Sequence, residues 1–590
     1  MKKIISLILI ILSFLLFSCN NVSNIDNSTT NIIRFDIDDI TININDYNDN
    51  YDFSNYVRVY NNDNLINYEE LNINRLGNIQ EGLCKFEVEY LGQRNEFIVN
   101  FIENFYNVSI NYGNRIQKYQ IKENDTLANQ NLSNKYTVNN ETMSIEGYYL
   151  DKEYKNKYDI NNRITSELNL YANLEYDFSY IRNSIDSDII YNTLNTYIDE
   201  FMNSTDSYIP SWNKESFKGK WNYIDGVFLN SIVNLFYETN NNKYKDFYLK
   251  YIDYYINENG EFIDPRTNDL AYNSKELDSV CESRILFDAY EMTKDIRYLN
   301  AINNTYNSLM EMPKAEGCNN FSHKAIYNNQ IWLDGMYMYV PFLARYAKLN
   351  NRNDLFNLIK EQYEYIRNHM YDEAKKLYYH GNDTTKSIFW SDKTTGNSNN
   401  FWLRSNGWYI VSLVDVLEYY PNGDNKDYLI NLLEEAIKGL LDYQENNTKL
   451  FYQLIDKGNT IYYVDYSYFE GLNNKNYYYS SYVKNYLESS GSSMIAYTLI
   501  KGASLGYLDD KYLNIGLDIF EGIYDYSFKN GSLNNICITA GLGPENKLYR
   551  DGSIAYYLAE NVGSDDAKGV GPFLMAFIEY SKNKNLIKNN

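Results

Sequence analysis

Histidine and cysteine, which often build sites or cross-links, are scarce in this chain, and so is proline. Its 590 residues include only 3 His, 5 Cys and 7 Pro. No two of the cysteines have the short spacing of a zinc or redox motif; they are Cys19, Cys84, Cys281, Cys318 and Cys537. The sequence therefore predicts neither a disulfide framework nor a cysteine-based metal site.

Positive charge is also in short supply. The chain has 54 Lys and Arg against 78 Asp and Glu, which gives a formal net charge of −24. Such a chain repels polyanions, so the composition argues against nucleic acid or an anionic membrane surface as a partner. If the substrate is itself anionic, a few local cations must capture it against this background.

The N-terminus carries an apolar run from Ile4 to Phe17 that follows two lysines. The run is too short to cross a bilayer and is typical of a secretory signal. It closes with LFSC, which resembles a bacterial lipobox; an ordinary signal with an incidental cysteine is the alternative. The resemblance implies a lipoprotein signal peptide over 1–18 and a lipidated polar tether over 19–31, with the lipid on Cys19. The protein is then expected to be exported and held to the bacterial cell envelope, periplasmic or surface, by this anchor alone.

Residues 32–176 contain no proline and alternate apolar with polar side chains, which is the pattern of β-strands. Apolar residues alternate over 86–90 and again over 97–101, and the polar segment 91–95 between them predicts a hairpin. We expect a β-sandwich-like module over 32–103, weakly similar to bacterial immunoglobulin-like modules.

A second module is expected over 104–176. The order of GYY, KYD and LYA within residues 147–175 resembles the Listeria–Bacteroides repeat, a small β-grasp surface module. Neither module shows catalytic chemistry, so the sequence predicts that both are spacers or weak adhesive units.

From 177 to 590 the apolar period changes to that of helices. A helix, a polar turn and a second helix recur, as in LFYETNNNKYKDFYLKYIDYYI and FLARYAKLNNRNDLFNLIKEQYEYI. Five such hairpins, with the helices over 177–209 and 572–584 as a further pair, indicate a repeat architecture. We expect a six-hairpin α/α toroid, with an open solenoid as the alternative. The toroid is favoured because Trp, His, Asp and Gly cluster in the linking segments at one end of each hairpin.

Two of the three histidines lie in these linking segments. His323 precedes Asp334 by eleven residues, and His380 is followed by a glycine. One histidine alone is usually structural, but two beside Trp and Asp indicate a site. A zinc site is the less favoured alternative, because no HxxxH or HxH spacing is present. We therefore expect no metal and no other cofactor.

Asp334 is the one carboxylate in the apolar stretch NQIWLDGMYM, with no Lys or Arg for several residues on either side. An unpaired buried carboxylate is costly. Asp334 therefore either faces solvent or is a site residue in a half-apolar pocket. Further along, Trp402 and Trp408 flank Arg404. Core packing would explain the tryptophans, but the arrangement also suits a sugar ring stacked beside a cation that holds a carboxylate.

Together these motifs resemble glycoside hydrolase family 105, the unsaturated rhamnogalacturonyl hydrolases, and more distantly the unsaturated glucuronyl hydrolases. The matching motifs run in family order from about 200 to 584 and are WNYIDGVFL, LDS, FSH, QIWLDGMYM, HG, FWLRSNGWY, YLESSGSSMIAY and YRDGS–AKGVGPF. The resemblance implies a six-hairpin α/α barrel with Asp334 as the catalytic acid/base and Asp278 as a second carboxylate that orients the water or the acid. It also implies a pocket for an unsaturated uronate, lined by Tyr223, His323, His380, Trp402, Arg404 and Trp408.

The activity implied by this resemblance is removal of the terminal 4,5-unsaturated uronic acid from oligosaccharides that a polysaccharide lyase has released. Rhamnogalacturonan-type (pectin) oligosaccharides are the expected substrates, cleaved by hydration of the C4=C5 double bond. One alternative is an unsaturated glucuronyl hydrolase acting on glycosaminoglycan-type disaccharides. Another is a classical inverting glycosidase that uses Asp334 and Asp278 as an acid and base pair. The third is a non-catalytic surface lipoprotein that only binds glycans.

Overall fold

The computed structural model describes residues 31–113, 115–138, 141–203, 219–464 and 482–587. The expected signal peptide, most of the tether and the lipidation at Cys19 lie outside these residues. Within them, no helix combines the length and the apolar character that a membrane crossing needs. The chain divides into two compact units, of which the first comprises Met1–Val108, Tyr119–Gln130 and Asn161–Leu168, and the second the remainder.

The first unit contains two small sheets around a common apolar core. One sheet has the order β1-β3-β4 and the other β2-β7-β6-β5, with β2 parallel to β7. Their buried residues form one cluster that includes Val59, Phe86 and Val99. The strands are β1 (Ile33–Ile37), β2 (Ile40–Asn43), β3 (Val57–Asn61), β4 (Asn64–Leu65), β5 (Asn72–Arg75), β6 (Gly82–Tyr90) and β7 (Gln93–Ile102).

The hairpin expected between 86–90 and 97–101 is present as β6 and β7, which pair Phe86 with Phe97. Its turn is shorter than the polar segment 91–95 suggested, because Tyr90 already pairs with Gln93. The two turn residues, Leu91 and Gly92, both have positive φ, of 47° and 79°. A two-residue turn of this kind matches the twist of the flanking strands, so the hairpin tolerates the strained Leu91.

In the second unit, strands of the expected β-grasp module share a sheet with a hairpin from the helical region. The sheet order is β10-β11-β13-β20-β21, and β13 joins β20 through the pairs Leu174–Ile461 and Glu175–Thr460. These strands are β10 (Lys135–Val138), β11 (Glu141–Tyr149), β12 (Lys157–Tyr158), β13 (Leu168–Glu175), β20 (Thr460–Tyr463) and β21 (Tyr482–Lys484); β8 (Phe105–Asn111) and β9 (Ile116–Lys122) come earlier in the chain. The β-sheet therefore includes strands from beyond residue 176, the expected end of the module.

The helical region forms two concentric layers. Helices of the inner layer are buried around most of their circumference, as an apolar sequence on all sides requires. They are α3 (Tyr223–Thr239), α5 (Asp278–Glu282), α6 (Ile285–Thr293), α8 (Gly335–Leu349), α10 (Leu403–Leu417), α12 (Ser489–Ser504) and α15 (Ala567–Asn583). Helices of the outer layer bury one stripe and expose the rest. They are α2 (Ser187–Asn203), α4 (Asn242–Tyr255), α7 (Ile296–Met310), α9 (Asn353–Met370), α11 (Asp424–Leu441) and α13 (Lys511–Ser527).

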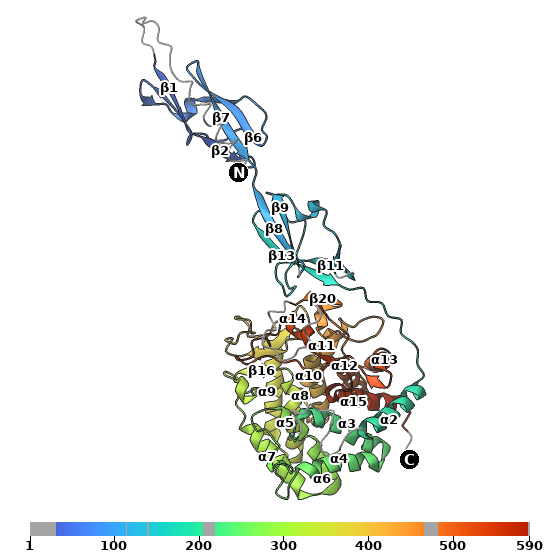
Figure 1. The fold of residues 1–590 in the computed structure, drawn as a ribbon. Coiled ribbons are helices and arrows are strands. Elements are labelled where there is room, and N and C mark those ends of the chain that lie inside the picture. The colour runs from blue at the N-terminus through green and yellow to red at the C-terminus, as the bar shows by residue number, and fades with distance from the viewer. Residues whose placement is uncertain (1–30, 114, 139–140, 204–218, 465–481, 588–590) are drawn as a thin grey trace. The chain divides into compact units, whose positions relative to one another are not determined.

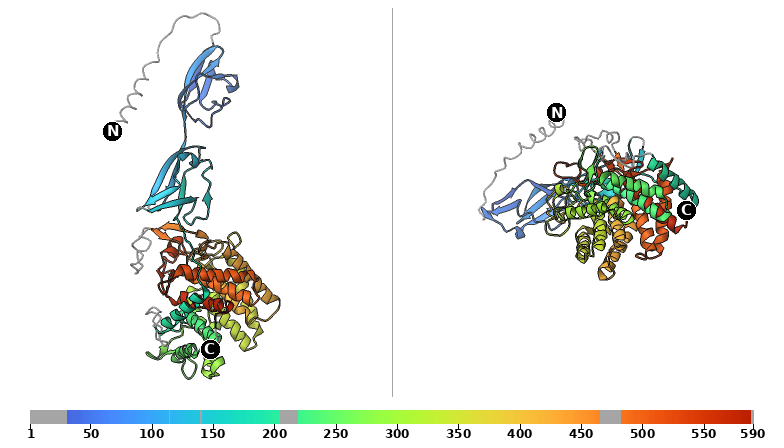
Figure 2. Two further views of the ribbon diagram at one scale, coloured as in Figure 1. Left: turned by 90° about the vertical axis from the view of Figure 1, so that its right-hand side faces the viewer. Right: turned by 90° about the horizontal axis from the view of Figure 1, so that it is seen from below.

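The inner layer closes on itself. Along the chain α3 contacts α5 and α6, α5 contacts α8, α8 contacts α10, α10 contacts α12, and α12 contacts α15. The last helix, α15, then packs against the first, α3, which Figures 1 and 2 show as red beside green. This closure confirms the helical toroid against the open solenoid, while the number of six hairpins stays a prediction.

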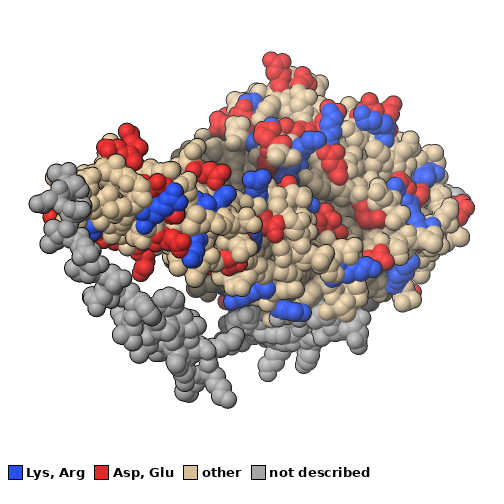
Figure 3. Space-filling model, turned by 90° about the horizontal axis from the view of Figure 1, so that it is seen from above, with Lys and Arg blue, Asp and Glu red and all other residues tan. Residues whose placement is uncertain are grey.

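The toroid brings the N-terminal ends of the inner helices to one mouth, because each outer helix returns the chain before the next inner helix begins. Asp278 begins α5, Asp334 immediately precedes α8, and Trp402 immediately precedes α10. The molecular face drawn in Figure 3 mixes acidic and basic side chains. The residues that set the helical region apart are instead those at the starts of the inner helices, among them Asp278, Asp334 and Trp402.

Candidate functional site

Three backbone connections hold the linking segments together. The N–H of His323 donates to the carbonyl of Gln330 (2.9 Å), and the His323 carbonyl accepts from the N–H of Leu277 (3.2 Å). The strand β16 (Gln330–Trp332) pairs antiparallel with β19 (Gly381–Asp383), and beyond their last pair the N–H of Leu333 donates to the His380 carbonyl (2.9 Å). The ladder places Asp278, His323, Asp334 and His380 at one location, although 102 positions separate the first from the last.

Asp334 and His380 face each other at this location. Asp334 Oδ2 lies 3.1 Å from His380 Nε2, close enough for an ion pair when the ring is protonated. Their mutual orientation does not meet hydrogen-bond geometry, and neither atom has a hydrogen-bond partner elsewhere in the described residues. The other ring nitrogen, Nδ1, lies 2.5 Å from the Tyr557 hydroxyl, which fixes the plane of the imidazole. Two buried polar atoms without a satisfied hydrogen bond indicate a place where a ligand supplies one.

The second carboxylate, Asp278, pairs with the Lys324 ammonium and lies near the His323 ring. Lys324 Nζ lies 2.7 Å from Asp278 Oδ2 and 2.9 Å from Glu276, and His323 Nε2 lies 3.6 Å from Asp278 Oδ1. Burial acts to raise the pKa of Asp278, but the Lys324 ammonium, with a smaller contribution from His323, holds it below its ordinary value. Burial also lowers the pKa of His323 to about 4, so this ring is neutral near pH 7. The arrangement keeps Asp278 ionised.

Aromatic rings line the space between these groups. Trp332 stacks on His323 (centroids 4.4 Å apart) and presents its edge to His380 (5.6 Å). The Trp402 ring lies 4.8 Å from His380 on the other side. Flat apolar rings around a few polar groups are a common way to hold a sugar ring.

Arg404 lies over the face of Trp402, with its guanidinium carbon 4.9 Å from the ring centroid. One guanidinium nitrogen donates to the Cys537 carbonyl and lies 3.4 Å from the Ser490 hydroxyl. Burial opposes the charge, yet the neighbouring Cys537, Glu488 and Tyr223 keep the pKa of Arg404 above its ordinary value. Arg404 is thus a permanent, oriented cation within the site.

Tyr223, the first residue of α3, completes the group. Burial raises the pKa of its hydroxyl; Arg404 opposes this rise, whereas Asp278 and Asp334 add to it. All three charges therefore lie within electrostatic range of the Tyr223 hydroxyl. The structure therefore brings together Tyr223, Asp278, His323, Asp334, His380, Trp402 and Arg404.

Trp408 is placed differently from the other candidates. Its ring stacks on Tyr337 at 4.3 Å and belongs to the main helical core, whereas Trp402, which is equally buried, belongs to a separate cluster with Tyr557. This environment is that of a packing residue one and a half turns into α10. A direct role for Trp408 in lining the pocket remains a prediction from the family resemblance.

Three residues of the site were not among the sequence candidates: Lys324, Trp332 and Tyr557. Lys324 directly follows His323, and Trp332 stands in the same apolar motif as Asp334, so both had a weak local signal. Tyr557 had none, since it lies in one of several tyrosine pairs in a tyrosine-rich chain. For metals, no group of three or more His, Cys, Asp or Glu side chains in the described ranges is placed to hold an ion.

Chemically, the site combines a carboxyl group beside an imidazole, a second carboxylate held ionised, a fixed guanidinium and stacking rings. A carboxyl group within reach of a substrate can donate and accept a proton in successive steps. The guanidinium matches a substrate carboxylate.

Comparison with known proteins places this chemistry in a family. Residues 196–468 and 470–584 match the family model described as Glycosyl Hydrolase Family 88. Protein Atu3128 of Agrobacterium fabrum is 30% identical over 251 residues, covering 41% of this chain and 97% of that protein. An unsaturated 3S-rhamnoglycuronyl hydrolase of Formosa agariphila is 26% identical over 119 residues, covering 19% of this chain and 30% of that enzyme.

A solved structure agrees with the fold. A glycoside hydrolase from family 105 of C. acetobutylicum ATCC 824 is 32% identical, with a TM-score of 0.56 over 68% of this chain and 100% of the other. The family match includes the segments that carry Tyr223, Asp278, Asp334 and Arg404. The helical region is a glycoside hydrolase domain, and the chain belongs to glycosyl hydrolase family 88.

Proposed function

We propose that this protein removes the terminal 4,5-unsaturated uronic acid from lyase-generated oligosaccharides, most favourably those of the rhamnogalacturonan type. The observation that carries the proposal is the position of Asp334. It is 8% exposed and faces His380 at 3.1 Å, with an oxygen that makes no hydrogen bond within the described residues. This is the setting of an acid that gives a proton to a substrate carbon.

The double bond left by a lyase makes the terminal ring an enol ether. In the proposed reaction Asp334 delivers a proton to C4, and a water molecule adds at C5 while giving one of its protons to the Asp334 carboxylate. The product is a hemiketal at C5, which opens to a ketone and expels the remaining saccharide with its glycosidic oxygen. Asp334 acts first as acid and then as base, so the enzyme returns to its starting state.

The remaining groups bind and orient the sugar. Arg404, fixed over Trp402, is the partner proposed for the uronate carboxylate. Trp402 stacks on the ring, and His380 Nε2 lies 3.1 Å from Asp334 Oδ2. Asp278, ionised beside Lys324, orients the attacking water.

The choice of rhamnogalacturonan-type substrates is supported by the relatives. The solved structure at 32% identity is a glycoside hydrolase from family 105, and the Formosa relative is named an unsaturated 3S-rhamnoglycuronyl hydrolase. The name of the Formosa relative agrees with an unsaturated uronate linked to rhamnose. We propose further that the enzyme is exported, carries its lipid on Cys19 and acts after a polysaccharide lyase.

The experiment is incubation with unsaturated rhamnogalacturonan and chondroitin disaccharides, following loss of the ultraviolet absorbance of the double bond and, for every substrate, release of the reducing sugar. The matched control is the saturated disaccharide, which has the same glycosidic bond but nothing to hydrate. Turnover of the unsaturated and not the saturated sugar supports hydration. Equal turnover of both would show ordinary glycosidic cleavage and overturn the proposed mechanism.

A further inference from the structure

A loop of the expected β-grasp module reaches the hydrolase site. The loop joins β11 to β12 and is built around Asp151, whose carboxylate accepts from the N–H groups of Glu153 (3.1 Å), Lys155 (3.1 Å) and Asn156 (2.8 Å). Tyr154, between them, has a φ of 53°, a conformation that a tyrosine rarely adopts. A loop braced in this way presents its side chains in one fixed geometry.

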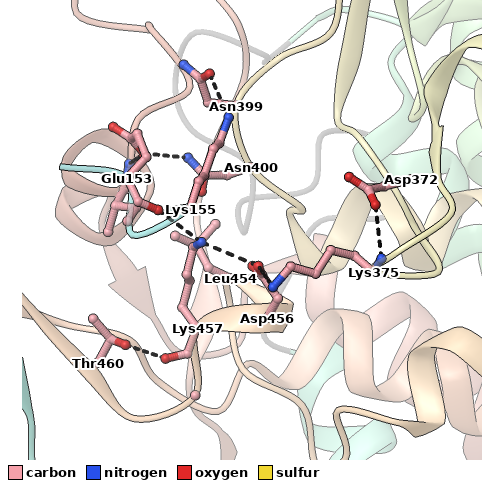
Figure 4. Close-up of polar contacts among 12 residues, drawn as sticks. Glu153, Lys155, Asp372, Lys375, Asn399, Asn400, Leu454, Asp456, Lys457 and Thr460 are labelled. Atoms are coloured by element: carbon pink, nitrogen blue, oxygen red, sulfur yellow. Dashed lines mark hydrogen bonds and ion pairs between the residues drawn. The ribbon is translucent and has the colours of Figure 1, made fainter. Parts of the chain in front are cut away.

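The side chains of this loop contact the mouth of the toroid. Glu153 Oε2 accepts from Asn400 Nδ2 (3.1 Å) and lies 3.4 Å from the N–H of Ile554, and the Glu153 carbonyl accepts from Lys457 (3.2 Å). Figure 4 shows Glu153 directed at Asn400 and, beside it, Lys155 directed at Asn399. The Glu153 carboxylate therefore touches two segments of the toroid that are 154 positions apart.

An apolar contact accompanies the polar ones. Tyr154 packs against the cluster that contains Trp402, Ile554 and Tyr557. Its hydroxyl donates to the Ala172 carbonyl at 3.3 Å, so the ring is held at both ends. Burial raises the pKa of the Glu153 carboxyl above its ordinary value, in keeping with a group enclosed by the toroid and the loop.

The two segments that Glu153 joins are the ones that orient His380. Asn400 lies two residues before Trp402, whose ring is 4.8 Å from His380, and Asn400 Nδ2 also donates to the Gly552 carbonyl (2.8 Å). Ile554 begins α14 (Ile554–Ala559), which carries Tyr557, the hydroxyl partner of His380 Nδ1. Glu153 thus contacts Asn400 and Ile554, which the chain connects over two and three residues to Trp402 and Tyr557. These two side chains in turn contact the imidazole that faces Asp334.

We propose that Glu153 is a positioning residue of the hydrolase site, and that the loop 151–156 is part of the catalytic unit. Its carboxylate holds Asn400 and the start of α14 in fixed positions. Trp402 and Tyr557 then contact His380 and keep its ring at the correct angle to Asp334. The second β-module is then a structural component of the active site. This inference rests on the proposed function where its test measures turnover of the unsaturated disaccharide.

The test compares three variants of the full chain with a matched control. Glu153→Ala removes the acceptor, Glu153→Asp shortens its reach by one methylene group, and Glu153→Gln keeps a carbonyl oxygen that still accepts from both donors. Glu146→Ala is the control, because Glu146 is an exposed carboxylate of the same module that pairs with the exposed Lys157 at 3.4 Å. Turnover is measured on the unsaturated rhamnogalacturonan disaccharide.

We expect kcat to fall roughly 10- to 100-fold in Glu153→Ala and Glu153→Asp with little change in KM, because a misplacement of about 1 Å can cost on the order of 100-fold. Glu153→Gln should keep kcat within about twofold, and Glu146→Ala should match the native enzyme. The Asp variant keeps the test decisive if the Ala variant does not fold.

A second readout does not depend on the substrate. The chain has only 3 His, so the imidazole NMR signals of histidine-labelled protein can be assigned with single His→Gln variants. Glu153→Ala and Glu153→Asp should displace the His380 signals and leave those of the exposed His369 unchanged. Native turnover and an unmoved His380 signal in these variants would overturn the inference, as would an equal loss in Glu153→Gln. If the enzyme turns over no unsaturated uronide, the proposed function fails, and the His380 signal still decides the positioning role.

Discussion

Asp334 and His380 lie on opposite arms of a short antiparallel pair, with Oδ2 and Nε2 3.1 Å apart at the mouth of the toroid. Each is the first polar group beyond its strand, β16 or β19, and each has an atom without a hydrogen bond among the described residues. This relationship is the basis of the acid role proposed for Asp334.

Replacing Asp334 by asparagine tests the acid. Asp334→Asn keeps the shape of the side chain but removes the proton that must reach C4. We expect kcat to fall roughly a thousandfold or more, since general acid/base catalysis supplies about 10²- to 10⁴-fold and the same group acts twice. Calorimetry should show that the unsaturated disaccharide still binds. The exposed Asp269→Asn is the control, and near-native kcat in Asp334→Asn would remove Asp334 from the mechanism.

Arg404 should act mainly on binding. Arg404→Ala removes the proposed partner of the substrate carboxylate. This ion pair stabilises the bound substrate as well as the transition state. We expect KM to rise by at least about tenfold, with a smaller change in kcat, in steady-state measurements on the disaccharide. Arg352→Ala, which breaks a surface ion pair with Asp354, is the control. An unchanged KM in Arg404→Ala would contradict the carboxylate assignment.

Lys324 should set the acid limb of the pH–rate profile. Burial acts to raise the pKa of Asp278 and the Lys324 ammonium lowers it, so Lys324→Met should raise that pKa. Asp278 then takes up a proton at a higher pH, and activity should be lost earlier as the pH falls. The measurement is kcat against pH for Lys324→Met and for the exposed Lys275→Met. Superimposable profiles for Lys324→Met and the native enzyme would exclude an ionised Asp278 from the reaction.

His323 should make the folded state sensitive to acid. Burial lowers its pKa from 6.5 to about 4 in the folded protein, whereas the unfolded chain protonates near the ordinary value. Between these values the unfolded state binds more protons, so stability is present above about pH 6.5 and is lost as the pH falls to about 4. At about 1.4 kcal/mol per pH unit, this amounts to roughly 3 kcal/mol.

Chemical unfolding at several pH values measures this effect. The His323→Gln variant should lose less of its free energy of unfolding than the native protein between pH 6.5 and pH 4. The exposed His369→Gln should change the pH dependence less. A pH dependence in His323→Gln equal to that of the native protein would show that other groups are responsible.

Cys19 is the predicted anchor. Cys19→Ala should stop fatty-acid labelling and release the protein from the membrane fraction of the expressing cells. Cys318→Ala, a partly exposed cysteine of the toroid, should leave labelling intact. Because one acyl chain gives only marginal membrane binding, we expect Cys19 to carry more than one. Continued labelling of Cys19→Ala would argue for an ordinary signal peptide.

Local sequence patterns were sufficient for the elements of this fold. The period-two stretch around Phe86 and Phe97 became a hairpin, and the helical repeats became the layers of a closed toroid. These patterns predict the elements because a strand or helix must bury one face, and the spacing of its apolar residues shows which face is buried. The candidate residues at the mouth follow from the same repeats, since every hairpin brings the start of its inner helix to the same end.

Only the tertiary structure decided which of these residues meet and in what state. Trp408 lies six residues after Trp402 and four after Arg404. No sequence pattern separates it from the residues of the site, yet it stacks on Tyr337 inside the barrel. The approach of His380 to Asp334 depends on the register of β16 against β19, and the ionisation of Asp278 on the ammonium of Lys324. The contact of Glu153 with Asn400 joins positions 247 residues apart. Charge, burial and hydrogen bonding act through space over a few ångströms, and sequence periodicity carries no record of such long-range neighbours.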